Sequence, residues 1–548
     1  MRLKHGEATS AKAVLSGFSI KIGGGGAMRV VSAHQMRELE ERAIRDFGIP
    51  SLLLMENAAL AVIQEVRQML EDRHIQLSAG RATVFVGKGN NGGDGLAVAR
   101  HLLILGMDIT VYSFARAEEF KGDAALNYRL YQNTGGKLFT IEGEKQRRLV
   151  RISLAQADVI IDAIYGTGFR GALPSLIDEY VEEINRAQVP VVAVDIPSGV
   201  EADTGKVYRK AIMADATVTF GLPKLGHFLG VGPEYAGRVS VDPISIPERF
   251  LDDEKLTTSI LTEDVCQYLP IRSLQGHKGT HGRGVLVAGS EGMTGAALLA
   301  GKAALRSGIG LLQMVVPRGL AEGIDLALTE ATVWGAESEK ALNGNAWPVI
   351  YERAEKAQAL AIGPGLGQEP ELLLVIEEVL RNLPLPVILD ADALNVLAKE
   401  PGILGWRQGR GPLILTPHPG EMARLCGCTT EEVQANRLEL AISKAVEWES
   451  IIVLKGAITI IAAPDGRAFL NPTGNPGLGT GGTGDVLTGS ILAWLAQGVE
   501  PLAAACLGVY LHGKAADQLT GEFGLSGYTA GEVADQLPKA RRSLENNH

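Results

Sequence analysis

The feature that most constrains the fold is a regular alternation of short apolar runs with stretches of helical spacing. Between residues 82 and 221, five such runs alternate with segments such as 96–105 and 176–187. Buried runs separated by helices are typical of parallel strands joined by crossover connections. The runs are 82–87, 108–114, 158–164, 190–196 and 216–221. The pattern therefore predicts an α/β domain with a mostly parallel sheet and helices on both faces.

A second series of the same kind follows a charged segment. Residues 248–258 have no periodic apolar face, which is typical of a linker. New apolar runs occur at 284–289, 311–317, 359–363, 386–392, 412–418 and 451–456. The two halves share no order of motifs, so they are no internal repeat. We expect two independent three-layer αβα domains at 28–247 and 260–548, joined by a linker at 248–259.

The first 27 residues belong to neither series. They contain the run Gly23 to Gly26, which cannot pack, and the amphipathic pattern begins only after Met28. Either Met28 is the true start, or residues 1–27 form a flexible leader. They lack the apolar core and cleavage site of a secretory signal. Neither version carries chemistry.

Composition excludes several classes of protein. Lys and Arg total 52 against 63 Asp and Glu, a net charge of −11, so we expect no nucleic-acid partner. No apolar run reaches the ~18 residues that span a bilayer, so we expect no membrane partner. The four cysteines are too few and scattered for a disulfide framework, which predicts a reducing, cytoplasmic location. Cys426 and Cys428 are interpreted as structural thiols, with a zinc site as the alternative.

Polar clusters follow three strands of the first half. Residues 87–92 satisfy GxGxxG between a strand and a helix, as a dinucleotide-binding loop does. Asp94 contradicts that role, since a pyrophosphate prefers N–H donors, and no acidic residue ends the next strand. Asp162 follows another strand, and Asp195 with Ser198 follows a third. These strand ends are expected to form one pocket; the alternative is that each motif is only a turn or cap.

These motifs resemble the NAD(P)H-hydrate epimerase family over roughly residues 28–246. The matching segments are KGNNGGDGLAVARHL, DAIYGTGFRG, DIPSG and TFGLPKLGH. The resemblance implies a crevice for hydrated nicotinamide nucleotide and potassium, with Asp195 as acid/base at the substrate. Potassium would be held by Asn91, Asp162 and Ser198, oxygen donors that suit a hard cation better than zinc. The implied hydrate contacts are Asn90, Asn91, Gly92, Gly93, Asp94, Gly166, Thr167, Gly168, Phe169, Arg170, Gly171, Ala172 and Asp195.

A glycine loop dominates the second half. Residues 475–485 read NPGLGTGGTGD, and 487–496 have helical spacing. A glycine run at a helix N-terminus presents unpaired N–H groups, which favours an anion. Asp485 at its edge is placed to accept a proton from a hydroxyl that attacks a phosphoryl group. The alternative is a mere helix cap. Walker A and protein-kinase motifs are absent, and the loop resembles that of the ribokinase-like fold.

Longer motifs resemble the NAD(P)H-hydrate dehydratase family over about residues 260–538. They are HKGTHGRGVLVAGS, GAALLAGKAALRSG, GPGLG, LDADALN, TPHPGE and VLKGAIT. Ala297 replaces a proline of some members, with slight expected effect. Asp390 and Asp392 alternate at a strand end and are expected to face opposite ways, one of them orienting substrate or a magnesium-bound water. The resemblance implies hydrate contacts from Ala296, Gly367, His418 and Asp485, and adenine-nucleotide contacts from Lys455, Gly456, Ala457, Ile458, Thr459 and Gly484.

The two resemblances imply one task of metabolite repair. An isomerase half would interconvert R- and S-NAD(P)HX at C6, and a lyase half would convert the S epimer to NAD(P)H. They imply K⁺ in the first half, Mg²⁺ in the second, and ADP as co-substrate, although no residue decides between ADP and ATP. The expected partners are NADHX, NADPHX, ADP and further copies of the chain in a homo-oligomer. The alternatives are a ribokinase-like small-molecule kinase fused to a nucleotide-binding regulatory domain, and a non-catalytic scaffold, against which the complete Asp485 loop argues.

Overall fold

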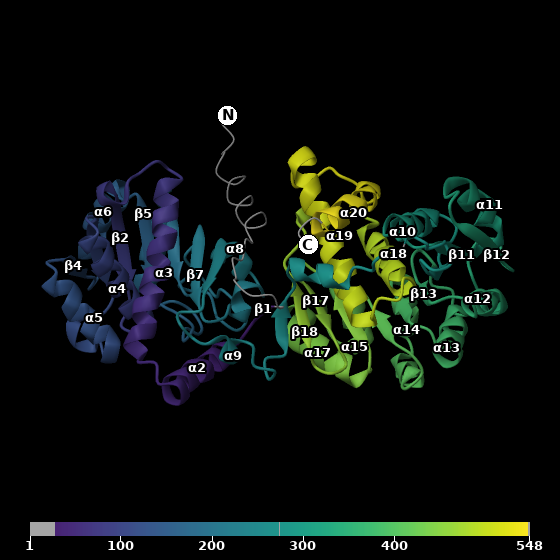
Figure 1. The fold of residues 1–548 in the computed structure, drawn as a ribbon, viewed down its shortest axis with the longest axis horizontal. Coiled ribbons are helices and arrows are strands. Elements are labelled where there is room, and N and C mark those ends of the chain that lie inside the picture. The colour runs from purple at the N-terminus through teal and green to yellow at the C-terminus, as the bar shows by residue number, and fades with distance from the viewer. Residues whose placement is uncertain (1–27, 273, 546–548) are drawn as a thin grey trace. The chain divides into compact units, whose positions relative to one another are not determined.

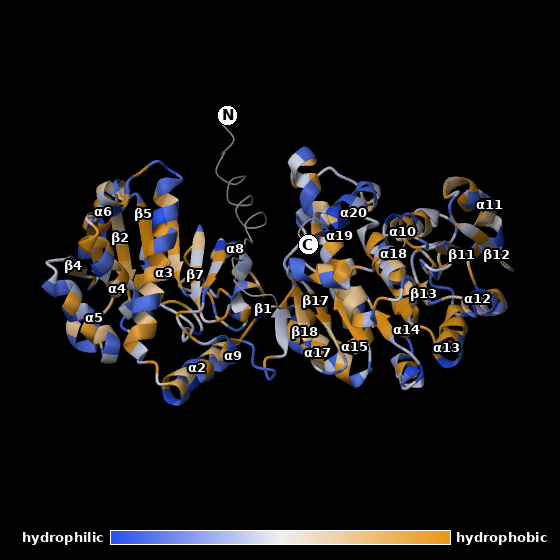
Figure 2. Cartoon of the chain, in the orientation of Figure 1, coloured by the Kyte–Doolittle hydropathy of each residue, from blue (hydrophilic) through white to orange (hydrophobic). Residues whose placement is uncertain are grey.

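The computed structural model describes residues 28–272 and 274–545, so the predicted leader at 1–27 lies outside the described residues. The chain divides into two compact units between Leu256 and Thr257 (Figure 1). In each unit, apolar strands form a sheet and the flanking helices turn polar residues outward (Figure 2). The predicted α/β class is therefore confirmed.

The N-terminal unit contains a seven-stranded sheet in the order β4-β3-β2-β5-β6-β7-β8, and all neighbouring strands are parallel. This is the Rossmann order 3-2-1-4-5-6 with one strand added, and its parallel strands agree with the predicted mostly parallel sheet. After the short strand β1 (Met28–Arg29), the strands are β2 (Arg81–Val86), β3 (Asp108–Ser113), β4 (Lys137–Thr140), β5 (Val159–Ala163), β6 (Val191–Val194), β7 (Ala216–Phe220) and β8 (Arg238–Asp242).

Helices cover both faces of this sheet. Successive strand residues point to opposite faces and therefore pack into two different hydrophobic cores. On β2, Val84 and Val86 pack with α3, α4 and α5, whereas Phe85 packs with α6 and α7. The helices are α2 (Ala33–Arg42), α3 (Ser51–Glu71), α4 (Asn90–Ile104), α5 (Gly122–Asn133), α6 (Arg147–Gln156), α7 (Ser175–Arg186), α8 (Gly232–Ala236) and α9 (Glu248–Leu251).

The strand order reverses between β2 and β5. The chain passes from β2 to β3 on one side and from β5 to β6 on the other. Ligands of doubly wound sheets bind in the crevice at such a switch point, outside the carboxyl ends of the strands. β2 leads into α4 there, and β5 leads into the loop 164–172. The topology therefore puts two of the predicted motifs at one crevice.

The sheet of the C-terminal unit runs β9-β18-β17-β16-β15-β14-β13-β10-β11-β12. β17 is antiparallel to both β16 and β18, and the other neighbours are parallel. The strands are β9 (Thr258–Ile260), β10 (Arg283–Val287), β11 (Leu311–Pro317), β12 (Thr332–Ala336), β13 (Ala359–Ile362), β14 (Val387–Leu389), β15 (Leu413–Leu415), β16 (Ile451–Leu454), β17 (Thr459–Ala462) and β18 (Ala468–Asn471).

Two helical layers enclose this sheet as well. Ala359 and Ala361 of β13 enter the core formed with α10, α18, α19 and α20, and the alternate residues Leu360 and Ile362 are buried on the other face. The helices are α10 (Thr294–Arg306), α11 (Arg318–Ala327), α12 (Trp347–Ala354), α13 (Leu372–Asn382), α14 (Ala391–Leu397), α15 (Pro419–Cys426), α16 (Thr430–Ala435), α17 (Arg437–Glu447), α18 (Thr483–Ala496), α19 (Pro501–Phe523) and α20 (Ala530–Glu545).

Two predicted segments differ from the structure. The predicted linker contains α9 and the start of β9, because Phe250 and Leu256 are buried and anchor it. The predicted strand 386–392 ends at Leu389. Asp390 is the residue before α14 and Asp392 lies in its first turn, so the expectation that both lie on a strand was wrong. Strand alternation does not apply after the chain has turned into a helix.

Candidate active sites

Glycines press the start of α4 against the sheet. A Cβ on Gly92 would lie 1.8 Å from the carbonyl oxygen of Gly87, and one on Gly95 would lie 2.4 Å from the Cβ of Ala163. Such distances exclude any larger residue, so these glycines serve close packing of helix on strand. They bring Asn90 and Asn91, the first two residues of α4, to the edge of the crevice.

Asp162 and Ser198 connect two strand ends. Ser198 donates from its hydroxyl to Asp162 Oδ1 over 2.6 Å and from its backbone N–H to Oδ2 over 2.8 Å. Asp162 also accepts from the backbone N–H of Ile164, and the Ser198 hydroxyl accepts from that of Tyr165. Burial raises the pKa of Asp162 to about 6, and these hydrogen bonds oppose that shift. The structure thus brings together two of the three predicted potassium ligands.

Asn91, the third predicted ligand, has an unsatisfied side chain. It is 8% exposed, and neither Oδ1 nor Nδ2 forms a hydrogen bond with a described residue. A Cβ on Gly166 would lie 3.2 Å from Asn91 Oδ1, so this amide adjoins the loop that follows β5. Buried amides normally have partners. A bound ligand or cation would supply the partner that the Asn91 amide lacks.

Asp195 forms the centre of a second polar group. It follows β6 with a positive φ of 68°, a strained conformation for a residue other than glycine. Its Oδ1 accepts from Lys224 Nζ over 2.6 Å and from the Thr219 hydroxyl over 2.9 Å. His227 accepts the backbone N–H of Lys224 at Nδ1, so its Nε2 donates to the carbonyl of Asp195. Oδ2 of Asp195 has no hydrogen bond within the described ranges 28–272 and 274–545.

Two further acids face this group. Burial raises the pKa of Asp94 well above its usual value, and the charges of Asp195 and Glu40 add to that shift. Burial likewise raises the pKa of Glu40 on α2 to about 7, an effect that Lys224 opposes and Asp195 increases. A raised pKa favours the neutral carboxyl, which reduces the repulsion that Asp94 would otherwise exert on a phosphate-bearing ligand. Perturbed acids in a crevice are candidates for proton transfer.

Some residues of the loop after β5 make contacts within the protein, and others are exposed to solvent. Phe169 is buried in the core beside Tyr165, and Arg170 pairs with Asp203 over 2.5 Å. Gly171 donates its N–H to Glu201. These contacts hold the loop itself. Gly166 adjoins Asn91, whereas Gly168 and Ala172 are exposed. Lys224, Thr219 and Glu40 were missed by the residue-level prediction; of these, only Lys224 and Thr219 lay within a recognised motif.

In the C-terminal unit, Asp485 lies in the first turn of α18. Gly482 caps this helix at φ 93°, and the loop before it is braced by Asn475, which bonds Asp517 and Tyr528. Burial raises the pKa of Asp485 to about 7; Asp390 adds to the shift and Lys455 opposes it. A carboxyl with a pKa near neutrality is suited to act as a general base.

Asp390 organises the surroundings of Asp485. It is 1% exposed and accepts from Lys455 Nζ, from the Thr416 hydroxyl and from the Thr488 hydroxyl over 2.7 to 2.8 Å. A Cβ on Gly484 would lie 3.5 Å from Lys455 Nζ, so the ammonium reaches the start of α18. Burial lowers the pKa of Lys455, but Asp390 and Glu421 outweigh it and the net pKa is raised. The lysine therefore stays charged beside the glycine loop.

The predicted nucleotide residues form the turn between β16 and β17. Arg437 donates to the carbonyl oxygens of Leu454, Lys455 and Ile458, which fixes this turn. A Cβ on Gly456 would lie 2.4 Å from the Arg437 guanidinium, which would have to move to admit a larger residue. Gly456 and Ala457 are exposed, and Ile458 and Thr459 are partly exposed. The turn is therefore rigid and open to a ligand.

The predicted hydrate contacts share a second edge of this site. His418 caps α15 by accepting the N–H of Gly420 at Nδ1, and its Nε2 lies 3.5 Å from Glu421 Oε1. Burial lowers the pKa of His418, and the charges of Lys455 and Arg424 lower it further. Glu421 is in turn 3.8 Å from Lys455 Nζ, so His418 is joined to the Asp390 group.

Asp392 positions the remaining contact, Gly367. Its Oδ2 accepts the Gly367 N–H over 2.9 Å, and Gly367 takes a φ of 78°. A Cβ on Gly365 would lie 3.0 Å from the Cβ of Ala296, so α10 adjoins the same loop. Asp390, Asp392, Glu421 and Arg437 were not among the predicted site residues. The first two lay within the recognised motif LDADALN and Glu421 within TPHPGE, whereas nothing in the spacing marked Arg437.

Over the described part of the chain, no group of three or more His, Cys, Asp or Glu could hold a metal by itself. Mg²⁺ needs none, because it is usually held by one or two carboxylates and the phosphates of a substrate. Cys426 and Cys428 are close enough for a thiol hydrogen bond, and burial raises the pKa of Cys426 to about 11. Among the described helices, none is long and apolar enough to cross a membrane.

Comparisons with known proteins cover both units. A family model described as YjeF-related protein N-terminus matches residues 51–226, and one described as NAD(P)H-hydrate dehydratase matches 284–539. A crystal structure of ADP/ATP-dependent NAD(P)H-hydrate dehydratase from Bacillus subtilis, co-crystallized with ATP/Mg²⁺, is 40% identical and covers 52% of this chain and 98% of its own, with a TM-score of 0.46.

Curated relatives match nearly the whole chain. The bifunctional NAD(P)H-hydrate repair enzyme Nnr of Moorella thermoacetica is 44% identical over 523 residues, which are 94% of this chain and 97% of that protein. The enzyme of the same name from Thermofilum pendens is 38% identical over 520 residues, again 94% and 97%. Because both units are matched in one relative at this identity, the chain belongs to the family of bifunctional NAD(P)H-hydrate repair enzymes.

Proposed function

We propose that the chain repairs hydrated NADH and NADPH in two steps. The predicted N-terminal domain, residues 28–247, epimerises R- and S-NAD(P)HX at C6. The predicted C-terminal domain, residues 260–548, dehydrates the S epimer with ADP and releases AMP and phosphate. The observation that carries the proposal is the Asp485 group: a carboxyl with a pKa near 7 beside a charged lysine, at a helix N-terminus.

In the dehydratase reaction, Asp485 accepts the proton of the C6 hydroxyl as that oxygen attacks the β-phosphorus of ADP. The bond between this phosphorus and the AMP oxygen breaks, and AMP leaves. The C6–O bond then breaks with its electrons on the departing phosphate, C5 loses a proton to that phosphate or to water, and the C5–H electrons form the ring double bond. Lys455 and the N–H groups at the start of α18 stabilise the charge that develops on the transferred group. Asp390 holds Lys455 in position by accepting a hydrogen bond from its ammonium group.

We assign ADP to the turn 455–459 and Gly484, and the hydrate to Ala296, Gly367, His418 and Asp485. The rigid, open turn supports the first assignment. The second is supported by the hydrogen bond from Gly367 to Asp392, by that from His418 to Glu421, and by the ion pair between Glu421 and Lys455. Mg²⁺ is proposed to accompany the nucleotide phosphates, which usually hold it together with one or two carboxylates. When bound, it would neutralise phosphate charge.

In the epimerase reaction, Asp195 is the acid/base at C6. Lys224 and Thr219 hold its Oδ1, which leaves Oδ2 to exchange a proton with the substrate. Asn90 to Asp94 and the loop 166–172 would bind the hydrate. Opening and reclosing at C6 then interconverts the epimers.

We propose potassium at Asn91, Asp162 and Ser198. A carboxylate offers about four lone-pair sites, and Asp162 uses three of them for hydrogen bonds. One remains, as does one on the Ser198 hydroxyl, and Asn91 Oδ1 has no partner. These donors fit a cation that would hold the two strand-end loops together and offset phosphate charge.

Product analysis tests the proposal against a kinase. Purified S-NADHX is incubated with the protein, ADP and Mg²⁺, and products are separated by chromatography. We expect NADH, AMP and phosphate in equal amounts. A phosphorylated hydrate that accumulates without NADH would instead identify a small-molecule kinase. The cytoplasmic location and the homo-oligomer stay predictions. Light scattering would test the second by measuring the mass of the protein in solution.

A further inference from the structure

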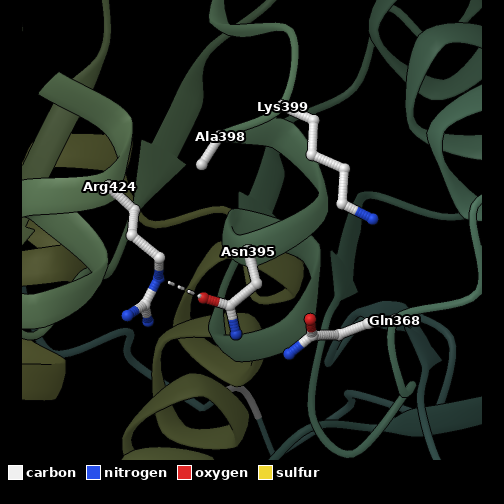
Figure 3. Close-up of a pocket in the computed structure, with 5 residues that line it drawn as sticks. All are labelled: Gln368, Asn395, Ala398, Lys399 and Arg424. Carbon is white, nitrogen blue, oxygen red and sulfur yellow. Dashed lines mark hydrogen bonds between the residues drawn. The ribbon is translucent and has the colours of Figure 1, made fainter. Parts of the chain in front are cut away.

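A pocket of about 540 Å³ lies in the C-terminal unit, within the range of roughly 300–1,000 Å³ for small-molecule sites. Figure 3 shows Asn395 and Ala398 of its wall between Arg424 on one side and Lys399 with Gln368 on the other. None of these five residues is among those assigned above to the hydrate or to ADP. The pocket is therefore a subsite without an assigned ligand.

The pocket contains two cationic side chains with unpaired donors. Arg424 donates from Nε to Asn395 Oδ1 over 3.0 Å, which orients its guanidinium. Its two Nη groups have no hydrogen bond or ion pair among the residues that the structure describes, and neither has the ammonium of Lys399. Arginine and lysine with free donors recognise phosphate, arginine through a planar fork. The Gln368 amide adds a neutral donor and acceptor.

The pocket adjoins the predicted hydrate site. Gln368 directly follows Gly367, and Asp392 accepts from both the Gly367 N–H and the Asn395 side chain, over 2.9 and 3.4 Å. Arg424 lies on α15, about 9 Å along the axis from the capping His418 at 1.5 Å per residue. The charge of Arg424 is also one cause of the lowered pKa of His418.

We propose that this pocket binds a phosphate group of the hydrated dinucleotide, with Lys399 and Arg424 as its ligands. The inference rests on the proposed dehydratase function. The dinucleotide is favoured over ADP because the pocket adjoins Gly367 and His418. The residues proposed for ADP lie instead in the turn after β16 and at the start of α18.

The test compares Lys399→Gln and Arg424→Gln with the wild type on S-NADHX and S-NADPHX. We expect each substitution to raise the KM for at least one hydrate by about tenfold, the effect of one charge-assisted phosphate contact, with kcat and the KM for ADP unchanged. Lys399→Arg should restore most of the affinity. Lys356→Gln is the matched control, since Lys356 is exposed and lies outside the pocket.

The two hydrates identify the phosphate. A rise confined to NADPHX assigns the 2′-phosphate to the pocket, and an equal rise for both assigns the pyrophosphate. Unchanged KM values for both hydrates, or a rise for ADP alone, would overturn the proposal. Calorimetric titration of NADPH and NADH into the same variants needs no turnover. It therefore tests the pocket even if the wild type proved unable to dehydrate either hydrate, a result that would refute the proposed function by itself.

Discussion

Asp195 Oδ1 accepts a hydrogen bond from Lys224 Nζ over 2.6 Å, and the lysine is 1% exposed. Asp195 comes at the end of β6 and Lys224 in the turn after β7, so the pair joins two neighbouring strand ends. One carboxylate oxygen is thereby fixed and the other is left for a ligand. This asymmetry distinguishes Asp195 from Asp162, whose two oxygens both accept protein hydrogen bonds.

Asp195→Asn should abolish epimerisation and leave dehydration intact. The amide nearly preserves shape but cannot exchange a proton, so R-NADHX should disappear only at its spontaneous rate of epimerisation. Turnover of S-NADHX should match that of the wild type. Chromatography of the two epimers over time measures both. Equal loss for both epimers would show that the two reactions do not have separate sites.

Asp485→Asn is the reciprocal variant. Losing a positioned general base should lower the rate of dehydration by ~10² or more. ADP binding should persist, because Lys455 and the loop N–H groups remain. The matched control is Asp465→Asn, which removes an exposed carboxylate of the same unit that pairs only with Arg467. Normal turnover by Asp485→Asn would make Asp485 a structural cap, and the reaction would need another base.

The pH dependence of dehydration should follow Asp485. A base acts when ionised, so kcat/KM should rise with pH through about 7, where burial has placed the pKa of this carboxyl. This rise of kcat/KM with pH should be absent from the residual activity of Asp485→Asn. A wild-type profile that stays flat from pH 5 to 8 would contradict the assignment, since an ordinary aspartate is already ionised over that range.

The same raised pKa predicts a cost in stability. A carboxyl whose pKa is raised on folding stabilises the folded state fully below its unfolded pKa, near 3.8, and this contribution is lost as pH rises through about 7. Asp485→Asn should therefore melt at a higher temperature than the wild type at pH 8. The difference in melting temperature between the two should be smaller at pH 5. Thermal unfolding at the two pH values measures the difference. An equal or lower melting temperature at pH 8 would show that ionised Asp485 is not strained by its surroundings.

Potassium should act through Asn91. Its unpartnered amide costs about 1–3 kcal/mol of folding free energy when no ligand is bound. KCl should therefore raise the melting temperature of the wild type above its value in equimolar tetramethylammonium chloride. Asn91→Leu should remove this response while remaining stable without potassium. A potassium effect that persists unchanged in Asn91→Leu would require withdrawal of these ligands. Asp162→Ala is a poorer test, because Asp162 holds the backbone N–H groups of Ile164 and Ser198.

Most of the fold could be predicted because buried parallel strands are continuous apolar runs. The run 311–317 is β11 itself, and the run 216–221 exceeds β7 by one residue. β4 escaped prediction, since its residues alternate between exposed and half-buried and give no such run. β16 and β17 form an antiparallel hairpin at the nucleotide turn, and β18 pairs antiparallel with β17; both lie outside the strand–helix alternation on which the prediction relied.

Candidate site residues could be singled out from the sequence at strand ends, as with Asp162 and Asp195, and at a glycine loop before a helix, as with Asp485. It was not predictable where a side chain acts from a distant element. Glu40 lies on α2, far in sequence from Asp195, yet their charges act on each other. Arg437 fixes the turn after β16 from the start of α17. Tertiary packing determines such partners, and no local sequence spacing predicts them.

The most direct test of the central claim is one time course with an equilibrated mixture of R- and S-NADHX, ADP, Mg²⁺ and K⁺. Wild-type protein should return all of the hydrate to NADH, read from the reduced nicotinamide absorbance, with one AMP formed per NADH. Asp195→Asn should consume the S fraction at the wild-type rate and then slow to the spontaneous rate. Wild-type conversion that stops at the S fraction would contradict a bifunctional enzyme, and conversion without AMP would contradict ADP-dependent dehydration.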